Sequence, residues 1–149
     1  MAAAGQPASD WRDHVHAVLS RAGHARGGAR ERVIALLGEQ RCALSALEIE
    51  DALRAQGRPT ARATIYRTLE LLAENGLLER ITVGDGQTRF EPVHPSGDHH
   101  HHLVCQQCGR LIAFDDPGLE QAIEGLQARL GVRVASHDVL LRGACARCR

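Results

Sequence analysis

Two Cys-x-x-Cys pairs constrain the last third of this 149-residue chain more than any other feature. The pairs are Cys105 with Cys108, and Cys145 with Cys148. Two intervening residues let both thiolates of a pair reach one ion from a tight turn, and four thiolates suit tetrahedral Zn²⁺. We therefore predict a structural zinc site. Redox-active or merely reduced thiols are the alternative, but no βαβ pattern typical of a thioredoxin-like motif lies near the first pair.

Four consecutive histidines, residues 99–102, lie just before the first cysteine pair. Because side chains alternate along a strand, His99 and His101 would face one side and His100 and His102 the other. The block can therefore supply two different metal sites, and imidazole ligands form more exchangeable sites than a thiolate cage. The alternative is a solvated His-rich loop or a tag, although a tag is not expected inside the chain.

Charge and hydropathy limit the classes of partner. The net charge is zero, all 18 basic residues are Arg, and residues 1–83 carry 11 Arg against 10 acidic residues, a net of +1. Binding to DNA would therefore need a few well-placed contacts. No apolar run approaches the roughly 18 residues of a membrane span, and residues 1–7 lack the layout of a secretory signal. We expect a cytoplasmic protein, in which paired cysteines bind metal more often than they form disulfides.

Turn and cap signals divide the chain. Residues 1–9 are expected to be disordered, and Ser45 with Glu48 forms a capping box. The expected elements of residues 10–84 are helices from about Asp10 to Gly23, Gly28 to Gly38, Ser45 to Gly57 and Ala61 to Asn75, and then two strands, 77–83 and 88–92. Three short helices followed by a two-stranded ribbon predict a winged helix-turn-helix domain. We assign residues 85–94 to a hinge.

Residues 95–149 are expected to form a small α/β dimerisation domain. Its expected elements are strands at 103–104, 111–114 and 132–141 and a helix at 117–130. A core of this size is marginal, so a zinc site and dimerisation would both stabilise it. The predicted fold class of the chain is therefore α+β.

The chain resembles the ferric-uptake-regulator (Fur) family of metal-dependent repressors from about residue 14 to 148. The resemblance rests on Ala-Thr-Ile-Tyr-Arg-Thr-Leu at 63–69, on residues 99–109, on Glu120 and His137, and on the last cysteine pair. It implies a homodimer that is not an enzyme and that binds palindromic double-stranded operator DNA with metal as co-repressor. The resemblance also implies that the genes it controls serve metal uptake.

The same resemblance implies three metal sites. The four cysteines match the structural zinc site. The ligands implied for a second site, within the dimerisation domain, are His99, His101, Glu120 and His137. The ligands implied for a sensing site at the hinge are Glu79, His94, His100 and His102.

One departure from the family pattern bears on the regulatory metal. Iron-type members place a His ligand before the third helix, where this chain has Cys42-Ala43-Leu44-Ser45. This favours the zinc-uptake-regulator (Zur) branch. The alternatives are an iron-, manganese- or peroxide-responsive regulator, with Fe²⁺ or Mn²⁺ at the regulatory site. Whether Glu91 or Cys42 contributes a ligand stays open.

The fourth helix is expected to be the recognition helix. The candidate DNA contacts are Arg30, Thr60, Arg62, Thr64, Tyr66 and Arg67. Two other classes of function compete with this hypothesis. A zinc hydrolase would need an open coordination position and a general base, and the chain has no His-Glu-x-x-His motif. A thiol or peroxide sensor would oxidise Cys42 or a histidine.

Overall fold

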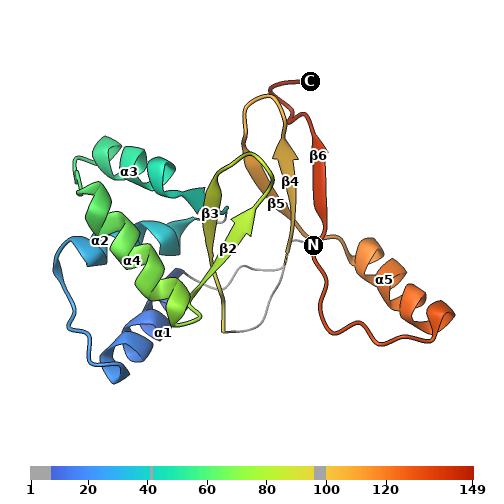
Figure 1. Cartoon of the computed structure of the whole chain (residues 1–149), viewed down its shortest axis with the longest axis horizontal. Coiled ribbons are helices and arrows are strands. Elements are labelled where there is room, and N and C mark those ends of the chain that lie inside the picture. Colours follow the sequence, from blue (N-terminus) through green and yellow to red (C-terminus); the bar gives the residue numbers. More distant parts are fainter. Residues whose placement is uncertain (1–7, 41, 96–99) are drawn as a thin grey trace. The chain divides into compact units, whose positions relative to one another are not determined.

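The computed structural model describes residues 8–40, 42–95 and 100–149. The chain divides into two compact units between Asp98 and His99 (Figure 1). The boundary therefore falls after the expected hinge, residues 85–94, and most of that segment belongs to a strand and a turn of the first unit. Of the segment expected to be disordered, residues 1–7 lie outside the described residues, and the first helix begins at Ala8.

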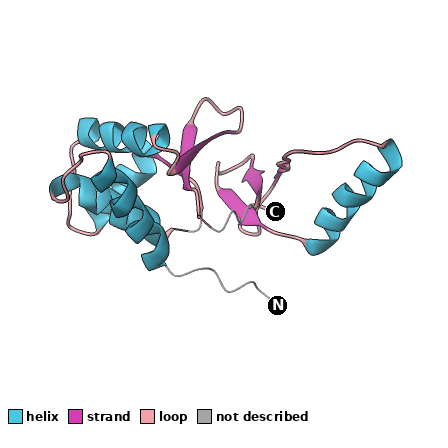
Figure 2. Cartoon of the chain, turned by 90° about the horizontal axis from the view of Figure 1, so that it is seen from below, coloured by secondary structure: helices cyan, strands magenta, loops and turns pink. Residues whose placement is uncertain are grey.

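The described part of the first unit contains four helices and a three-stranded antiparallel sheet, drawn in cyan and magenta in Figure 2. The helices are α1 (Ala8–Arg21), α2 (Gly28–Glu39), α3 (Ala46–Ala55) and α4 (Arg62–Glu74). The strands are β1 (Leu44–Ser45), β2 (Leu78–Thr82) and β3 (Thr88–Pro92), in the order β1-β3-β2. Because α2, α3 and α4 precede the β2–β3 hairpin, the unit is the predicted winged helix.

Local sequence signals explain where these elements begin and end. The Ser45 hydroxyl accepts from the Glu48 amide at 3.2 Å, and the Glu48 carboxylate accepts from the Ser45 amide at 2.7 Å. This confirms the capping box that starts α3. Gly76 ends α4 with φ 69°, a conformation that glycine adopts without strain. Positive φ angles of 84° and 78° at Gly84 and Gly86 turn the chain between β2 and β3.

The core of the first unit lies where the four helices meet the sheet. It is mostly Leu, Ile and Val, as the low aromatic content predicts, and Trp11 of α1 is fully buried within it. The Trp11 indole donates to the carbonyl of Leu77 at 3.2 Å. This bond gives the indole N–H a partner inside the core, so α1 is part of the winged-helix unit rather than a loose extension.

Residues 100–149, the described part of the second unit, form a three-stranded sheet and one helix. Its elements are β4 (His101–Cys105), β5 (Leu111–Phe114), α5 (Pro117–Leu130) and β6 (Leu140–Gly143). β4 is central, antiparallel to β5 and parallel to β6. Asp116 caps α5, and Gly131 ends it with φ 64°. The expected strand at 132–141 is wrong for residues 132–139, because Val132 and Val134 are exposed and His137 instead contacts Glu120 of α5.

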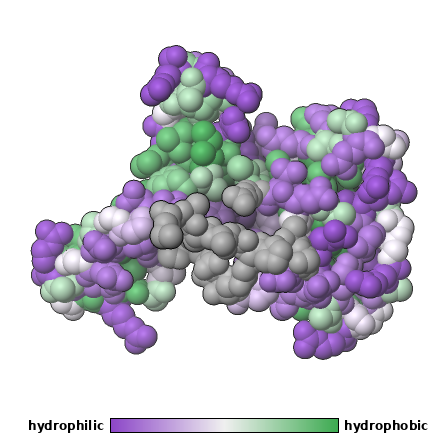
Figure 3. Space-filling view, turned by 180° about the vertical axis from the view of Figure 1, so that it is seen from behind, coloured by the Kyte–Doolittle hydropathy of each residue, from purple (hydrophilic) through white to green (hydrophobic). Residues whose placement is uncertain are grey.

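Apolar surface remains exposed on the second unit. Figure 3 shows hydrophobic area over its strands. The exposed large hydrophobic residues of this unit are Leu126, Leu130, Val132, Val134 and Leu141. No residue of α5 is buried, although the helix carries several apolar side chains. Such a surface is typical of a protein–protein interface. Among the described helices, none is both long and apolar enough to cross a lipid bilayer.

Candidate metal centres and nucleic-acid interface

The four cysteines meet in one cluster, as predicted. Cys105 ends β4, Cys108 lies in the turn after it, and Cys145 and Cys148 follow β6. All four sulfur atoms lie within 4.8 Å of one another, and those of Cys108 and Cys145 are 3.8 Å apart. A tetrahedral ion with Zn–S bonds of about 2.3 Å separates its sulfur ligands by about 3.8 Å. The donor atoms and their spacing therefore fit Zn²⁺.

The electrostatics of the cluster favour a bound cation. The amide of Cys145 donates to the Cys105 sulfur at 3.3 Å, and this bond leads the contacts that lower the pKa of Cys105 to about 6. The Arg147 amide lowers the pKa of Cys145 in the same way. The neighbouring Cys145 sulfur raises the pKa of Cys148 to about 12. Adjacent thiolates repel one another, so four of them need a divalent ion to ionise together.

A second cluster joins three of the four residues expected in the dimerisation-domain site. The Nε2 atoms of His101 and His137 lie 2.7 and 2.9 Å from the two carboxylate oxygens of Glu120. The Val139 amide donates to Nδ1 of His101, which turns Nε2 toward Glu120. Two imidazoles and a carboxylate form a ligand set that suits Zn²⁺ and other divalent ions. The expected fourth ligand, His99, lies outside the described residues.

The residues expected in the sensing site come from both units. His102 of β4 lies on the other face of the strand from His101, as the alternation predicts, and its ring centroid is 5.2 Å from that of His100, which directly precedes β4. Glu79 and His94 belong to the first unit. Nδ1 of His94 is buried and makes no hydrogen bond to a described residue.

Glu91, which the sequence left open as a ligand, lies directly opposite Glu79 in the β2–β3 pair. Glu91 is 7% exposed, and Glu79 is exposed. Two carboxylates directly opposite each other destabilise a sheet unless a positive charge is near. The pairing follows from the Gly84–Gly86 turn, because that turn fixes the register of the hairpin. The turn signal could therefore have identified Glu91 from the sequence.

Most of the residues expected to contact DNA lie on α4, whereas Arg30 lies on α2 and Thr60 precedes α4. Tyr66 is 49% exposed, a large fraction for an aromatic side chain, and Arg67 is also exposed. Thr64 and Arg30 are half-buried. Thr60 is only 8% exposed, and its hydroxyl donates to the Arg58 carbonyl, so this side chain is used inside the turn before α4. Arg62 is exposed but paired with Glu50, at 2.8 Å.

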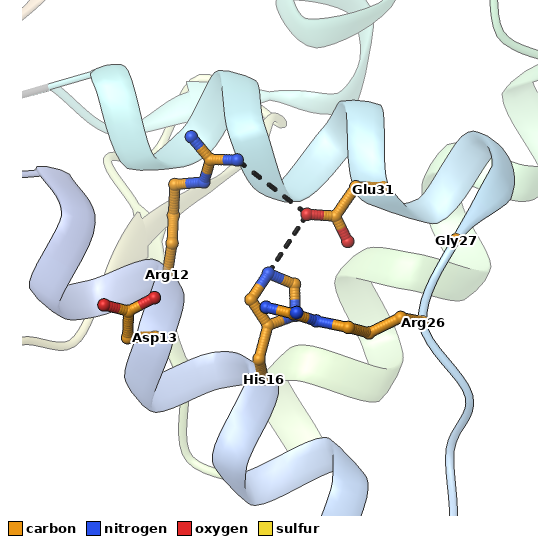
Figure 4. A pocket seen from close by; sticks show the side chains of 6 residues that line it. All are labelled: Arg12, Asp13, His16, Arg26, Gly27 and Glu31. Atoms are coloured by element: carbon orange, nitrogen blue, oxygen red, sulfur yellow. Dashed lines mark ion pairs between the residues drawn. The ribbon is translucent and has the colours of Figure 1, made fainter.

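A surface pocket between α1 and α2 contains none of these residues (Figure 4). The residues that line it are Arg12, Asp13, His16, Arg26, Gly27 and Glu31. Glu31 accepts from His16 at 3.0 Å and pairs with Arg12 at 3.8 Å. Its carboxylate is therefore engaged by side chains of α1, and these pairs hold α1 against α2.

A winged helix followed by a module with a four-cysteine metal cage defines a class of metal-responsive, DNA-binding regulators. The chain belongs to the ferric uptake regulator family, whose sequence profile matches residues 22–142. Members of the family are dimeric transcription regulators rather than enzymes.

Similar proteins include regulators named for different signals. The ferric uptake regulation protein of Bacillus subtilis is 32% identical over 114 residues, which cover 76% of each chain. The peroxide operon regulator of the same organism is 34% identical over 102 residues, which cover 68% of each chain. The crystal structure of the Vibrio cholerae ferric uptake regulator matches with a TM-score of 0.72 and 30% identity, over 88% of this chain and 99% of that one.

Proposed function

We propose that the chain is a zinc-responsive repressor of the Zur branch, which binds palindromic operator DNA as a metal-loaded homodimer and controls metal-uptake genes in the cytoplasm. The observation that carries this proposal is that one chain contains two chemically different kinds of metal-ligand cluster. One set is a cage of four thiolates suited to permanent zinc, and the others are built from imidazole and carboxylate, which exchange metal more readily.

We assign the cysteine cage to a structural role. Cys105 and Cys145 are buried, and the cage ties the end of β4 to the segment after β6. A zinc ion would supply the positive charge that lets all four thiols ionise. The four side chains then hold two distant parts of a small unit together, and this stabilises a core that is marginal by itself. His99, His101, Glu120 and His137 are proposed to form the second site of the same unit.

We assign sensing to Glu79, His94, His100 and His102. Support comes from the buried Nδ1 of His94 and from the register that sets Glu79 opposite Glu91. A buried imidazole nitrogen without a hydrogen bond is costly, and a bound cation would relieve that cost. A cation would also offset the like charges of two carboxylates that face each other. Because these ligands belong to two units, closing them on one ion would restrict how the winged helix moves relative to the pairing module. Metal then favours DNA binding only to the extent that it binds more tightly to the arrangement in which ligands of both units hold the ion than to the arrangement in which they do not.

We further propose that α4 enters the major groove, with Tyr66 and Arg67 at its centre and Arg62, Thr64 and Arg30 contributing contacts. Thr60 is proposed to act through the turn that positions α4, because its side chain is buried. The exposed apolar residues of the second unit are proposed to pair with a second copy of the chain. A dimer would place two α4 helices in successive major grooves, about 34 Å apart.

The sensing site is tested with the double variant Glu79→Ala, His100→Ala. The probe is a duplex selected from a random library with the zinc-loaded wild-type protein. We expect the double variant to stay dimeric and to keep its cysteine-bound zinc, but to lose zinc-dependent binding of the probe in a gel shift. A matched control, His14→Ala with Glu74→Ala, removes the same residue types from α1 and α4 and should bind as the wild type does.

A double variant that still binds the probe only when zinc is added would show that the sensing ligands are assigned wrongly. The choice of metal needs a separate titration, because the similar proteins include regulators named for iron and for peroxide. Binding of the probe is therefore measured with buffered Zn²⁺, Fe²⁺ and Mn²⁺. We expect half-maximal binding at the lowest free concentration with Zn²⁺. Activation by Fe²⁺ or Mn²⁺ but not by Zn²⁺ would overturn the Zur assignment.

A further inference from the structure

Glu50 of α3 lies between two arginines in the first unit. Its Oε2 accepts from Nε of Arg62 at 2.8 Å, and its Oε1 accepts from an Nη atom of Arg54 at 3.1 Å. The Glu50 side chain is only 13% exposed, whereas those of Arg62 and Arg54 are each 63% exposed. The hydrogen bond from Arg62 is the main cause that lowers the pKa of Glu50, so the carboxylate is charged at neutral pH.

We propose that Glu50 is a specificity-determining residue for DNA binding, because it holds the Arg62 guanidinium in one orientation at the start of α4. The inference rests on the proposed function, since it requires α4 to be the helix that meets DNA. Glu50 itself is not proposed to touch DNA. It is a positioning residue that acts through Arg62.

The position of Arg62 explains why it needs such a partner. Arg62 is the first residue of α4, and Ala61 before it provides no side-chain cap. A positive side chain at the positive end of a helix dipole is unfavourable, and an adjacent carboxylate offsets this. Amides at a helix N-terminus also attract phosphate. An unrestrained Arg62 at this point would therefore bind the phosphate of any sequence.

Glu50 reduces this sequence-independent binding of phosphate by Arg62 in two ways. It occupies Nε of Arg62 and leaves the Nη atoms to donate in a fixed direction, which suits a fixed partner on DNA. It also cancels one positive charge per subunit at the surface of α4. Non-specific affinity for DNA comes from such charges. Residues 1–83 carry a net charge of only +1. One additional positive charge would therefore be a large change in the charge that attracts DNA to this unit.

The test is Glu50→Gln in the full-length, zinc-loaded protein. Binding is measured by fluorescence anisotropy on the selected operator duplex and on a scrambled duplex, over a range of salt concentrations. We expect affinity for the scrambled duplex to rise about two- to fivefold per subunit, the range for releasing one exposed ion pair. The slope of log K against log salt for that duplex should steepen by about 1.8 per dimer, one added phosphate contact per subunit. Operator affinity should rise less, so the specificity ratio falls.

Two further variants separate orientation from general charge. Asp51→Asn removes the same charge from the next residue of α3, which hydrogen-bonds Arg54 and acts on Arg62 only as a weaker, more distant charge. It should change the specificity ratio and the salt slope clearly less than Glu50→Gln does, because it leaves the Glu50–Arg62 bond in place. In an Arg62→Gln background, Glu50→Gln should have no effect on either quantity. A merely structural role of Glu50 would not depend on Arg62 in this way.

The outcomes distinguish this inference from the function on which it rests. A wild-type protein that selects no duplex with any metal would refute the proposed function. A wild-type protein with metal-dependent operator binding, together with equal effects of Glu50→Gln and Asp51→Asn, would refute only the role of Glu50. Persistence of the Glu50→Gln effect without Arg62 would also overturn it.

Discussion

At the scale of single residues, the four cysteines determine the chemistry of the second unit, because their sulfur atoms lie close enough together to bind one tetrahedral zinc ion. Cys-x-x-Cys pairs could be recognised because two-residue spacing is a local property that survives any arrangement of the rest of the fold. The Glu50–Arg62 pair could not be recognised, because its members lie 12 residues apart on two helices and their contact depends on how α3 packs against α4. In the sequence, nothing distinguishes Glu50 and Arg62 from the other charged residues of the helices.

Cys108→Ser should remove the structural metal. Cys108 is exposed, so the substitution costs little in packing, and any loss of stability reports the lost ion. We expect zinc bound per chain, measured by elemental analysis, to fall by one equivalent, and the melting temperature to fall as well. Cys42→Ser is the control, because Cys42 is outside the cage, and it should keep both values. Retention of full zinc content by Cys108→Ser would refute the cage.

Asp85→Asn should weaken the wing in a pH-dependent way. Arg89 is almost entirely buried and pairs with Asp85 at 2.8 Å, which lowers the pKa of Asp85 below its ordinary 3.8. A lowered carboxyl pKa contributes stability above the unfolded pKa, and this is lost as pH falls through the folded value. The wild type should therefore resist urea better than the variant at pH 7, and the difference should shrink below about pH 4. An equal difference at pH 7 and pH 3 would exclude this pair as the cause.

At the scale of elements, caps and turns predicted most of the first unit. Ser45, Gly76 and the Gly84–Gly86 turn fix the ends of α3, α4 and the wing strands, because each satisfies backbone groups or allows positive φ locally. β1 was not predicted, since two residues are too few to show a period of two. The strand expected at 132–141 was wrong for residues 132–139, because in this segment the apparent period is misleading. Its alternating apolar residues mimic a strand, but they remain exposed, and the sheet continues only from Leu140.

Ser45→Ala should destabilise the first unit by about 1 kcal/mol, because it removes the side-chain half of the capping box. Urea unfolding followed by Trp11 fluorescence measures this directly, since Trp11 is the only tryptophan and is buried in that unit. Ser20→Ala provides the control, because Ser20 is exposed near the end of α1. A Ser45→Ala variant as stable as Ser20→Ala would show that α3 does not need this cap.

At the scale of the whole molecule, the division into a winged helix and a metal-binding module could be predicted, because composition changes where the histidines and cysteines begin. The two compact units meet a few residues beyond the end of the segment expected to be a hinge. The second wing strand carries Glu91 toward that boundary, so a segment expected to be a hinge is largely part of the first sheet. Local patterns in the sequence indicate which segments form strands. A hinge is a segment that pairs with neither unit, and no local pattern indicates that property.

The most direct test of the account compares zinc-loaded and metal-stripped wild-type protein on the same operator duplex. A chelator that removes the imidazole-bound metal but leaves the cysteine-bound zinc is chosen, and elemental analysis confirms one retained equivalent per chain. We predict that stripping weakens operator binding at least about tenfold, equivalent to about 1.4 kcal/mol of coupling, and that added zinc restores it. Equal operator affinity before and after stripping, with the dimer and the cysteine-bound zinc intact, would contradict the account.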